Sequence, residues 1–129
     1  MTREKLLELA EAARQRSYSP YSGFCVGAAL LTKDGEVFTG CNIENVSYSP
    51  TCCAERVAVF SAINAGKREF EAIAIVGGKR GESADAPCYP CGVCRQVLSE
   101  FCSKDMKMYF AADVETTLGE LLPHSFDLI

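Results

Sequence analysis

An Asp-Gly pair, Asp34-Gly35, lies between two strand-like segments and is the most informative local feature of this sequence. The first segment, residues 24–32, is apolar almost without interruption, and the second covers residues 36–41. An Asp-Gly pair in this setting is a strong signal for a β-hairpin, because its residues tolerate the backbone conformation of a tight turn. Any fold that this chain adopts is therefore expected to contain an antiparallel pair of strands.

Helices and further strands are predicted on both sides of this hairpin. Apolar residues with the spacing of one helical face follow Thr2, which can cap that helix. Thr117 and Glu120 form a capping box for a short last helix. The predicted elements are helices over 3–16, from 52 or 53 to 65, and over 92–102, strands over 71–77 and 106–111, and a short helix that Pro123 ends.

The order α-β-β-α-β-α-β-α predicts a three-layer α/β/α sandwich. Its sheet is expected to be mixed, with four to five strands, because the hairpin is antiparallel and the later strands join through helices. With 129 residues the chain has the usual size of one domain, so we expect a single domain over residues 1–129.

The charge and hydropathy of the chain exclude several classes of partner. Its 13 basic and 17 acidic residues give a net charge of −4, and the basic residues form no cluster, which disfavours polynucleotides and anionic membranes. No apolar run approaches the roughly 20 residues of a membrane-spanning helix, and the charged N-terminus is not followed by the apolar core of a signal peptide. We therefore expect a cytoplasmic protein whose ligand is small or neutral.

The predicted second helix indicates an oligomer. Residues 57–63 are apolar on nearly every face of that helix. A helix that is apolar all round must be buried all round, which a monomer of this size can seldom achieve.

Eight cysteines are unusual for a cytoplasmic chain of this length, where clustered thiols more often bind metal or react than form disulfides. Two motifs stand out, Cys53-Ala54-Glu55 and Pro90-Cys91-Gly92-Val93-Cys94, each at a predicted helix start. The Cys-x-x-Cys pair could be a redox dithiol, part of an iron–sulfur site or half of a zinc site. The iron–sulfur interpretation fails at the expected fourth ligand position, which is Leu98.

A zinc site needs one or two ligands besides Cys91 and Cys94. The chain has a single histidine near its end, so the remaining ligand should be a cysteine, and Cys53 is the best candidate because Glu55 follows it by two residues at the same helix end. Three protein ligands leave a fourth position for water, as in catalytic sites, and Glu55 could then move protons. The alternative is a closed structural site with Cys52 or Cys88 as fourth ligand.

These motifs resemble those of the small homotetrameric zinc-dependent cytidine deaminases, in the variant with three cysteine ligands. The resemblance extends over nearly the whole chain. It includes Phe24–Leu30, Gly40–Asn45, Cys53–Arg56, Pro90–Gln96 and Leu121-Leu122-Pro123-x-x-Phe126. Residues 112–116 depart from it, since they are shorter than the family's usual turn and fifth strand, and a full edge strand there is an open question.

The resemblance implies a role for each matching residue. Cys53, Cys91 and Cys94 would bind one Zn²⁺ per subunit, and Glu55 would carry protons. The implied substrate contacts are Asn42 and Glu44 with the ribose, Phe24 and the backbone of Ala54 with the base, and Phe126 contributed by a neighbouring subunit. Arg56 would donate hydrogen bonds to a thiolate, which offsets the net charge of −1 that three thiolates and Zn²⁺ carry.

The implied activity is hydrolytic deamination of cytidine and deoxycytidine to uridine and deoxyuridine with release of ammonia, in pyrimidine salvage. A site at the subunit interfaces of a cytoplasmic homotetramer is implied as well. Three alternatives stay open at this point. They are a deaminase for a blasticidin-type nucleoside or a free base, a non-catalytic zinc module, and an editor of polynucleotides.

Overall fold

The chain folds around one mixed five-stranded sheet in the order β2-β1-β3-β4-β5, in a computed structural model that describes residues 1–128. The strands are β1 (Phe24–Thr32), β2 (Val37–Cys41), β3 (Phe70–Lys79), β4 (Lys107–Tyr109) and β5 (Glu115–Thr117). The helices are α1 (Arg3–Arg14), α2 (Ala54–Asn64), α3 (Gly92–Phe101) and α4 (Leu118–Leu121).

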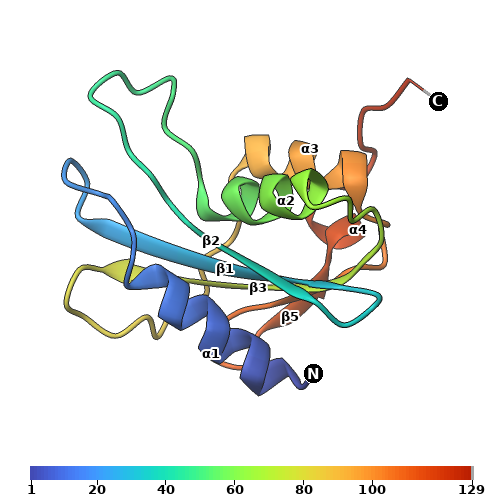
Figure 1. The fold of residues 1–129 in the computed structure, drawn as a ribbon, viewed down its shortest axis with the longest axis horizontal. Coiled ribbons are helices and arrows are strands. Elements are labelled where there is room, and N and C mark those ends of the chain that lie inside the picture. The colour runs from blue at the N-terminus through green and yellow to red at the C-terminus, as the bar shows by residue number, and fades with distance from the viewer. Residues whose placement is uncertain (129) are drawn as a thin grey trace.

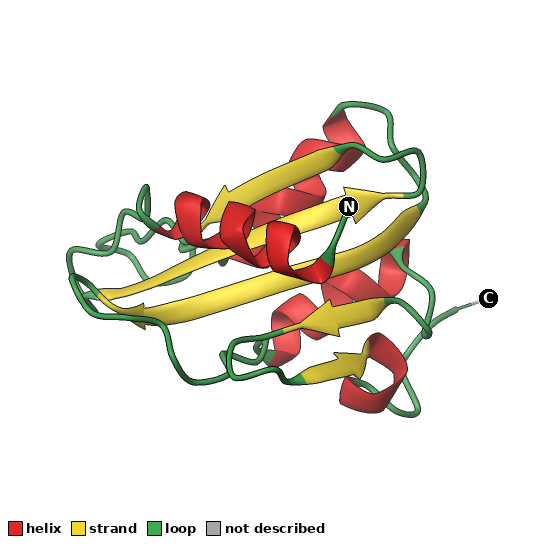
Figure 2. Cartoon of the chain, turned by 90° about the horizontal axis from the view of Figure 1, so that it is seen from below, coloured by secondary structure: helices red, strands yellow, loops and turns green. Residues whose placement is uncertain are grey.

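The long apolar strand β1 lies near the middle of the sheet and is antiparallel to both of its neighbours, β2 and β3. The pair β3 and β4 is parallel and is joined through α3, whereas β4 and β5 are antiparallel. Helix α1 covers one face of the sheet, and α2 and α3 cover the other (Figures 1 and 2). The predicted three-layer α/β/α sandwich with a mixed sheet is therefore confirmed.

Each face of the sheet has its own apolar core. Leu6 and Ala10 of α1 pack with Ala29 and Ala74 on one face. The larger core lies under α2 and α3 and includes completely buried Ile73, Leu98, Met108 and Phe110. No helix among residues 1–128 is long and apolar enough to cross a membrane.

The sequence left undecided whether a fifth strand forms, and the structure shows one: β5 is a three-residue edge strand paired with β4. The chain reaches it through a tight turn in which Ala112 and Asp113 have φ values of 64° and 56°. Two consecutive residues in the left-handed conformation reverse the chain direction within a few residues. The short segment between β4 and β5 is therefore long enough to let the two strands pair. Thr117 then ends β5 and caps α4, since its Oγ1 accepts a hydrogen bond from the Glu120 N–H at 3.3 Å.

Two glycines allow helices to approach the sheet closely. A Cβ atom on Gly27 would lie 2.0 Å from the carbonyl oxygen of Ala10 in α1, and one on Gly40 would lie 2.5 Å from that of Ala54 in α2. The first turn of α2 is therefore seated directly on β2. The loop before α2 and the loop before α3 bring the N-termini of these two helices together at one end of the helical layer (Figure 1).

Candidate metal centre and active site

Three cysteines converge where α2 and α3 begin. Cys53 is the N-cap of α2, Cys91 is the N-cap of α3, and Cys94 lies in the first turn of α3. Their Sγ atoms all lie within 4.8 Å of one another, and those of Cys53 and Cys91 are 4.0 Å apart. Cys91 and Cys94 lie close together because side chains at the N-cap and at the third position of a helix face each other.

The sulfur positions fit a zinc ion. Zinc–sulfur bonds of about 2.3 Å in a tetrahedron place ligand sulfurs about 3.8 Å apart, so small side-chain adjustments would complete the geometry. Neither N-cap cysteine uses its side chain to cap its helix, which leaves both thiols available as ligands. Both lie at helix N-termini, where the helix dipole favours negative charge. The cluster is thus suited to hold a cation through thiolates.

Arg56 lies against this cluster. Its Nη2 donates a hydrogen bond to Cys53 Sγ at 3.2 Å. The interaction with Cys94, followed by that with Arg56, lowers the pKa of the Cys53 thiol. Arg56 therefore supplies the positive charge that would bring a three-thiolate zinc centre from −1 to neutrality.

Glu55 is the second residue of α2 and is only 4% exposed, although it carries a carboxyl group. Burial raises its pKa to about 7, the Cys53 thiolate adds to this effect, and Arg56 opposes it. A carboxyl group that can be protonated or ionised near neutral pH is suited to proton transfer. Glu55 lies two residues after the candidate ligand Cys53, so its carboxyl group and the Cys53 thiol belong to the same helix start.

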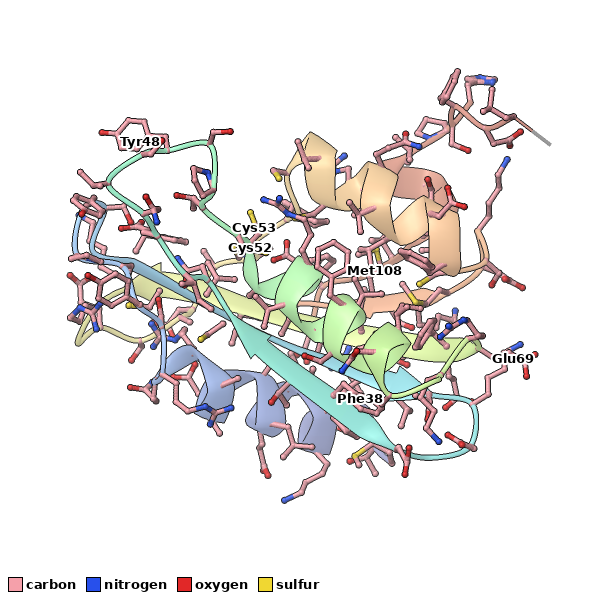
Figure 3. The ribbon with its side chains drawn as sticks, turned by 45° about the horizontal axis from the view of Figure 1, so that its top comes forward. Phe38, Tyr48, Cys52, Cys53, Glu69 and Met108 are labelled. Atoms are coloured by element: carbon pink, nitrogen blue, oxygen red, sulfur yellow. The ribbon has the colours of Figure 1, made fainter. Side chains whose placement is uncertain are left out.

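The structure places Cys52 and Cys88 outside the cluster. Among residues 1–128, the group of mutually close metal-ligating side chains contains Cys53, Cys91 and Cys94 and no fourth thiol. Cys52 and Cys53 are adjacent at the start of α2 (Figure 3), but the backbone of Cys52 pairs with that of Ile43. Burial raises the pKa of the Cys88 thiol to about 11. The arrangement therefore favours an open site with three protein ligands over a closed one.

Two predicted substrate contacts, Asn42 and Glu44, lie just after β2, where the chain passes the start of β1. The Asn42 amide oxygen accepts a hydrogen bond from the Val26 N–H at 2.9 Å, and its Nδ2 donates one to the Phe24 carbonyl at 2.8 Å. Phe24 itself begins β1, and its ring lies over Gly77 of β3. Asn42 thus links the strand that carries Phe24 to the segment that carries Glu44.

The remaining predicted residues have contrasting positions. Ala54 is fully buried as the first residue of α2. Phe126 is 70% exposed in the segment after α4, where its carbonyl accepts a hydrogen bond from Gln96 Nε2 of α3. The single chain therefore gathers the candidate metal ligands, Glu55 and Arg56, whereas the segment that carries Phe126 lies at the opposite end of the molecule from the start of β1 (Figure 1).

Sequence reasoning missed residues that hold the predicted ones in place. Ser22 and Tyr21, in the loop before β1, contact the Glu44 carboxylate. Arg95 in α3 donates through Nε to the Pro90 carbonyl and through Nη1 to the Leu121 carbonyl, both at 2.8 Å. The only sequence signal for Tyr21 and Ser22 was a turn rich in serine, proline and glycine, and Arg95 entered only as a member of the motif Pro90–Gln96, without a role of its own.

Comparison with known proteins agrees with this geometry. Residues 1–111 match the family model for the cytidine and deoxycytidylate deaminase zinc-binding region. A cytidine deaminase from Sporosarcina psychrophila is 49% identical over 127 residues, which are 95% of this chain and 90% of that protein. A blasticidin-S deaminase from Bacillus cereus is 34% identical over 125 residues, 91% of this chain and 89% of that protein.

Solved structures give the same result. The crystal structure of a cytidine deaminase from Burkholderia pseudomallei has a TM-score of 0.89 and 49% sequence identity, and the match covers 98% of this chain and all of that one. The chain therefore belongs to the family of cytidine and deoxycytidylate deaminases, which are hydrolytic enzymes.

Proposed function

We propose that this chain catalyses the zinc-dependent hydrolytic deamination of cytidine and deoxycytidine, giving uridine and deoxyuridine with release of ammonia, in pyrimidine salvage. The observation that carries the proposal is the convergence of three thiols at two helix N-termini beside a buried glutamate. Membership in the deaminase family supports the same reaction.

In this proposal Cys53, Cys91 and Cys94 hold one zinc ion per subunit. When bound there, zinc lowers the pKa of a coordinated water and so supplies the nucleophile that attacks C4 of the base. Arg56 keeps the thiolates neutralised through its hydrogen bond to Cys53. A dithiol with redox function would need a free Cys-x-x-Cys pair, whereas here a third thiol and an arginine complete the cluster.

Glu55 carries the protons of the reaction. It accepts a proton from the attacking water and passes it to N3 of the base. It then moves the proton of the new hydroxyl group at C4 to the amino group, so that the C4–N bond breaks, the C4 carbonyl of uridine forms and ammonia leaves; one water is consumed for each ammonia released. Burial of Glu55 excludes bulk water from these transfers.

The other predicted contacts would orient the nucleoside. Phe24 supplies an aromatic face for the planar base, and the backbone of Ala54 lies beside Glu55 at the same helix start. Asn42 and Glu44 would bind sugar hydroxyls, because an amide and a carboxylate together offer both a donor and an acceptor.

Glu55→Gln tests the role of Glu55. The variant keeps the size of the side chain but cannot take up the proton, so it should bind zinc and fold normally while losing nearly all turnover of cytidine. Glu8→Gln, at an exposed position of α1, is the matched control and should be fully active. Full activity in Glu55→Gln would refute the mechanism.

A second substrate class follows from the relationship to a blasticidin-S deaminase. Rates on cytidine, deoxycytidine, cytosine and blasticidin S separate the possibilities directly. We expect the two pyrimidine nucleosides to react much faster than cytosine, because only they engage Asn42 and Glu44. A clear preference for blasticidin S would replace the proposed substrate.

We propose further that the enzyme is a homotetramer in which Phe126 completes the site of a neighbouring subunit. Two observations support this proposal. Phe60 of the apolar helix α2 is 46% exposed in the single chain, and Phe126 is 70% exposed in a segment after α4 that lies at the opposite end of the molecule from the start of β1 (Figure 1). Full activity of a monomer at low concentration would contradict the assignment of Phe126 to a neighbour's site.

The proposed compartment is the cytoplasm, because the site depends on reduced thiols and all eight cysteines are free in the described chain. A nucleoside fits the site better than a polynucleotide, since the chain carries a net charge of −4.

A further inference from the structure

The loop that joins α1 to β1 holds the side chains that are proposed to bind the sugar. Ser17 Oγ donates a hydrogen bond to the Asn42 amide oxygen at 2.5 Å, in addition to the bond from the Val26 N–H. The Asn42 amide oxygen thus already accepts two hydrogen bonds. Its Nδ2 donates one N–H to the Phe24 carbonyl, so the other N–H of the amide is free. Asn42 can therefore offer a ligand one donor and little else.

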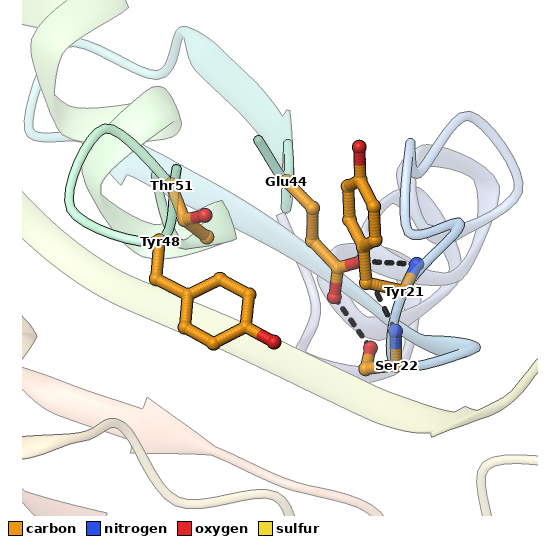
Figure 4. A pocket seen from close by; sticks show the side chains of 5 residues that line it. All are labelled: Tyr21, Ser22, Glu44, Tyr48 and Thr51. Carbon is orange, nitrogen blue, oxygen red and sulfur yellow. Dashed lines mark hydrogen bonds between the residues drawn. The ribbon is translucent and has the colours of Figure 1, made fainter. Parts of the chain in front are cut away.

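The Glu44 carboxylate, in contrast to the Asn42 amide, offers only acceptors, and residues of the same loop hold it in place. Its Oε1 accepts hydrogen bonds from the backbone N–H groups of Tyr21 at 2.9 Å and Ser22 at 3.2 Å. Its Oε2 accepts one from the Ser22 hydroxyl at 2.5 Å, so both oxygens are fixed by the same turn (Figure 4). The Ser22 hydroxyl, the backbone N–H groups and the charge of Arg80 keep the pKa of Glu44 below its usual range.

These contacts border an open cavity of about 290 Å³ lined by Tyr21, Ser22, Glu44, Tyr48 and Thr51. The volume is at the low end for small-molecule sites, so the cavity suits one part of a ligand, such as a sugar. Tyr48, at the outer part of the loop between β2 and α2, is 80% exposed (Figure 3).

The Ser22 hydroxyl makes a second hydrogen bond. It accepts from the backbone N–H of Phe24 at 3.0 Å while it donates to Glu44. One hydroxyl group thus joins the proposed sugar contact to the backbone of the proposed base contact. No other side chain among residues 1–128 makes hydrogen bonds to both Glu44 and Phe24; the Asn42 side chain bonds to Phe24 but not to Glu44.

We propose that Ser22 is a positioning residue for nucleoside binding, which fixes the Glu44 carboxylate at the sugar end of the site and sets its distance from Phe24. The inference rests on the proposed nucleoside deamination and assigns a function to a residue that touches neither the metal cluster nor Glu55. Ser22 acts through Glu44 and need not touch the substrate itself.

The role predicts a change in KM and little change in kcat. Ser22→Ala releases one Glu44 oxygen, so the carboxylate must be ordered when the sugar binds. For a lost hydrogen bond to a charged group we expect the KM for cytidine to rise about tenfold. The kcat should stay within about twofold, because the proton-transfer geometry is unchanged.

The experiment compares steady-state kinetics of the zinc-loaded wild type, Ser22→Ala and Ser22→Thr, with cytidine and 2′,3′-dideoxycytidine as substrates. In this proposal Glu44 binds the ribose hydroxyls at 2′ or 3′, both of which dideoxycytidine lacks, so its KM should be the same in Ser22→Ala and the wild type. Ser22→Thr keeps the hydroxyl and should restore the KM for cytidine. The matched control is Ser103→Ala, which removes another serine–carboxylate bond of 2.5 Å, to Asp105.

Three results would overturn the inference. They are an unchanged KM for cytidine in Ser22→Ala, equal losses with both substrates, and a threonine variant as impaired as the alanine variant. Inactivity of the wild type on cytidine would instead refute the proposed function. In that case an NMR titration tests the contact between Ser22 and Glu44 separately, since the pKa of Glu44 should rise in Ser22→Ala, and an unchanged pKa would refute that contact.

Discussion

Replacing Gly40 with alanine should lower the activity by displacing the helix that carries residues of the proposed active site. Gly40 lies in β2 and packs against the first turn of α2, the helix whose start carries Cys53 and Glu55. A Cβ atom at this position would lie 2.5 Å from the Ala54 carbonyl oxygen and 2.6 Å from the Ala58 backbone nitrogen. Since both are backbone atoms, no side-chain rotation relieves the overlap.

The size of the overlap sets the expected effect. Ordinary contacts of a Cβ atom begin at 3.4 Å, so α2 and β2 must separate by about 0.9 Å. Overpacking of this kind costs about 1–3 kcal/mol of stability. A misplacement of catalytic groups by about 1 Å costs on the order of 100-fold in turnover. Activity should therefore fall much more than the folded fraction does.

The assay measures cytidine turnover per folded, zinc-loaded molecule, with folding followed by circular dichroism. Gly27→Ala is the matched control, because its Cβ would lie 2.0 Å from the Ala10 carbonyl oxygen in α1, on the opposite face of the sheet. Both variants should melt at lower temperature than the wild type. Only Gly40→Ala should lose turnover when both are assayed at a temperature where they are folded.

Two outcomes would contradict the predicted displacement of α2. Undiminished turnover in a folded Gly40→Ala variant would mean that its contact with α2 does not set the position of Cys53 and Glu55. An equal loss per folded molecule in Gly27→Ala would show that general destabilisation, and not the displacement of α2, lowers activity.

Two further predictions concern charge. Arg56→Gln removes the hydrogen bond to Cys53 and should weaken zinc binding about 10- to 100-fold, as measured by competition with a chelator. Arg68→Gln, beyond the far end of α2 from the cluster, should leave zinc binding unchanged. Because its folded pKa is lowered, Glu44 should keep its bonds to the loop at every pH above the ordinary glutamate pKa and lose them only as pH falls through the lowered value. Amide exchange at Ser22 checks this, and loss of protection already near pH 5 would contradict it.

Much of the fold could be predicted because its elements are long and regularly patterned. The hairpin around Asp34-Gly35 and the helices that begin near Thr2 and Cys53 all have strong local signals, and their observed bounds differ from the predicted ones by a few residues. The edge strand β5 was harder, since three residues show no periodicity and the turn before it depends on left-handed Ala112 and Asp113.

The metal cluster was predictable for a different reason. Spacing within Cys-x-x-Cys places Cys91 and Cys94 together; the shortage of histidine pointed to a third cysteine, and Glu55 two residues after Cys53 singled that one out. The support of Glu44 by Ser22 could not be predicted, because it joins residues 22 apart through a turn of irregular conformation. The single-domain organisation and the role of Phe126 in a neighbouring subunit remain predictions.

In the proposed enzyme, Cys53, Cys91 and Cys94 hold a zinc ion without which the protein cannot deaminate a nucleoside. The most direct test is ammonia release from cytidine by the purified protein, before and after treatment with a chelator, together with metal analysis. We predict one zinc per chain, activity that is lost with the metal, and recovery when zinc is returned. Cytidine turnover that persists in metal-free protein, or a protein that binds zinc through Cys53, Cys91 and Cys94 and releases no ammonia, would contradict the proposed function.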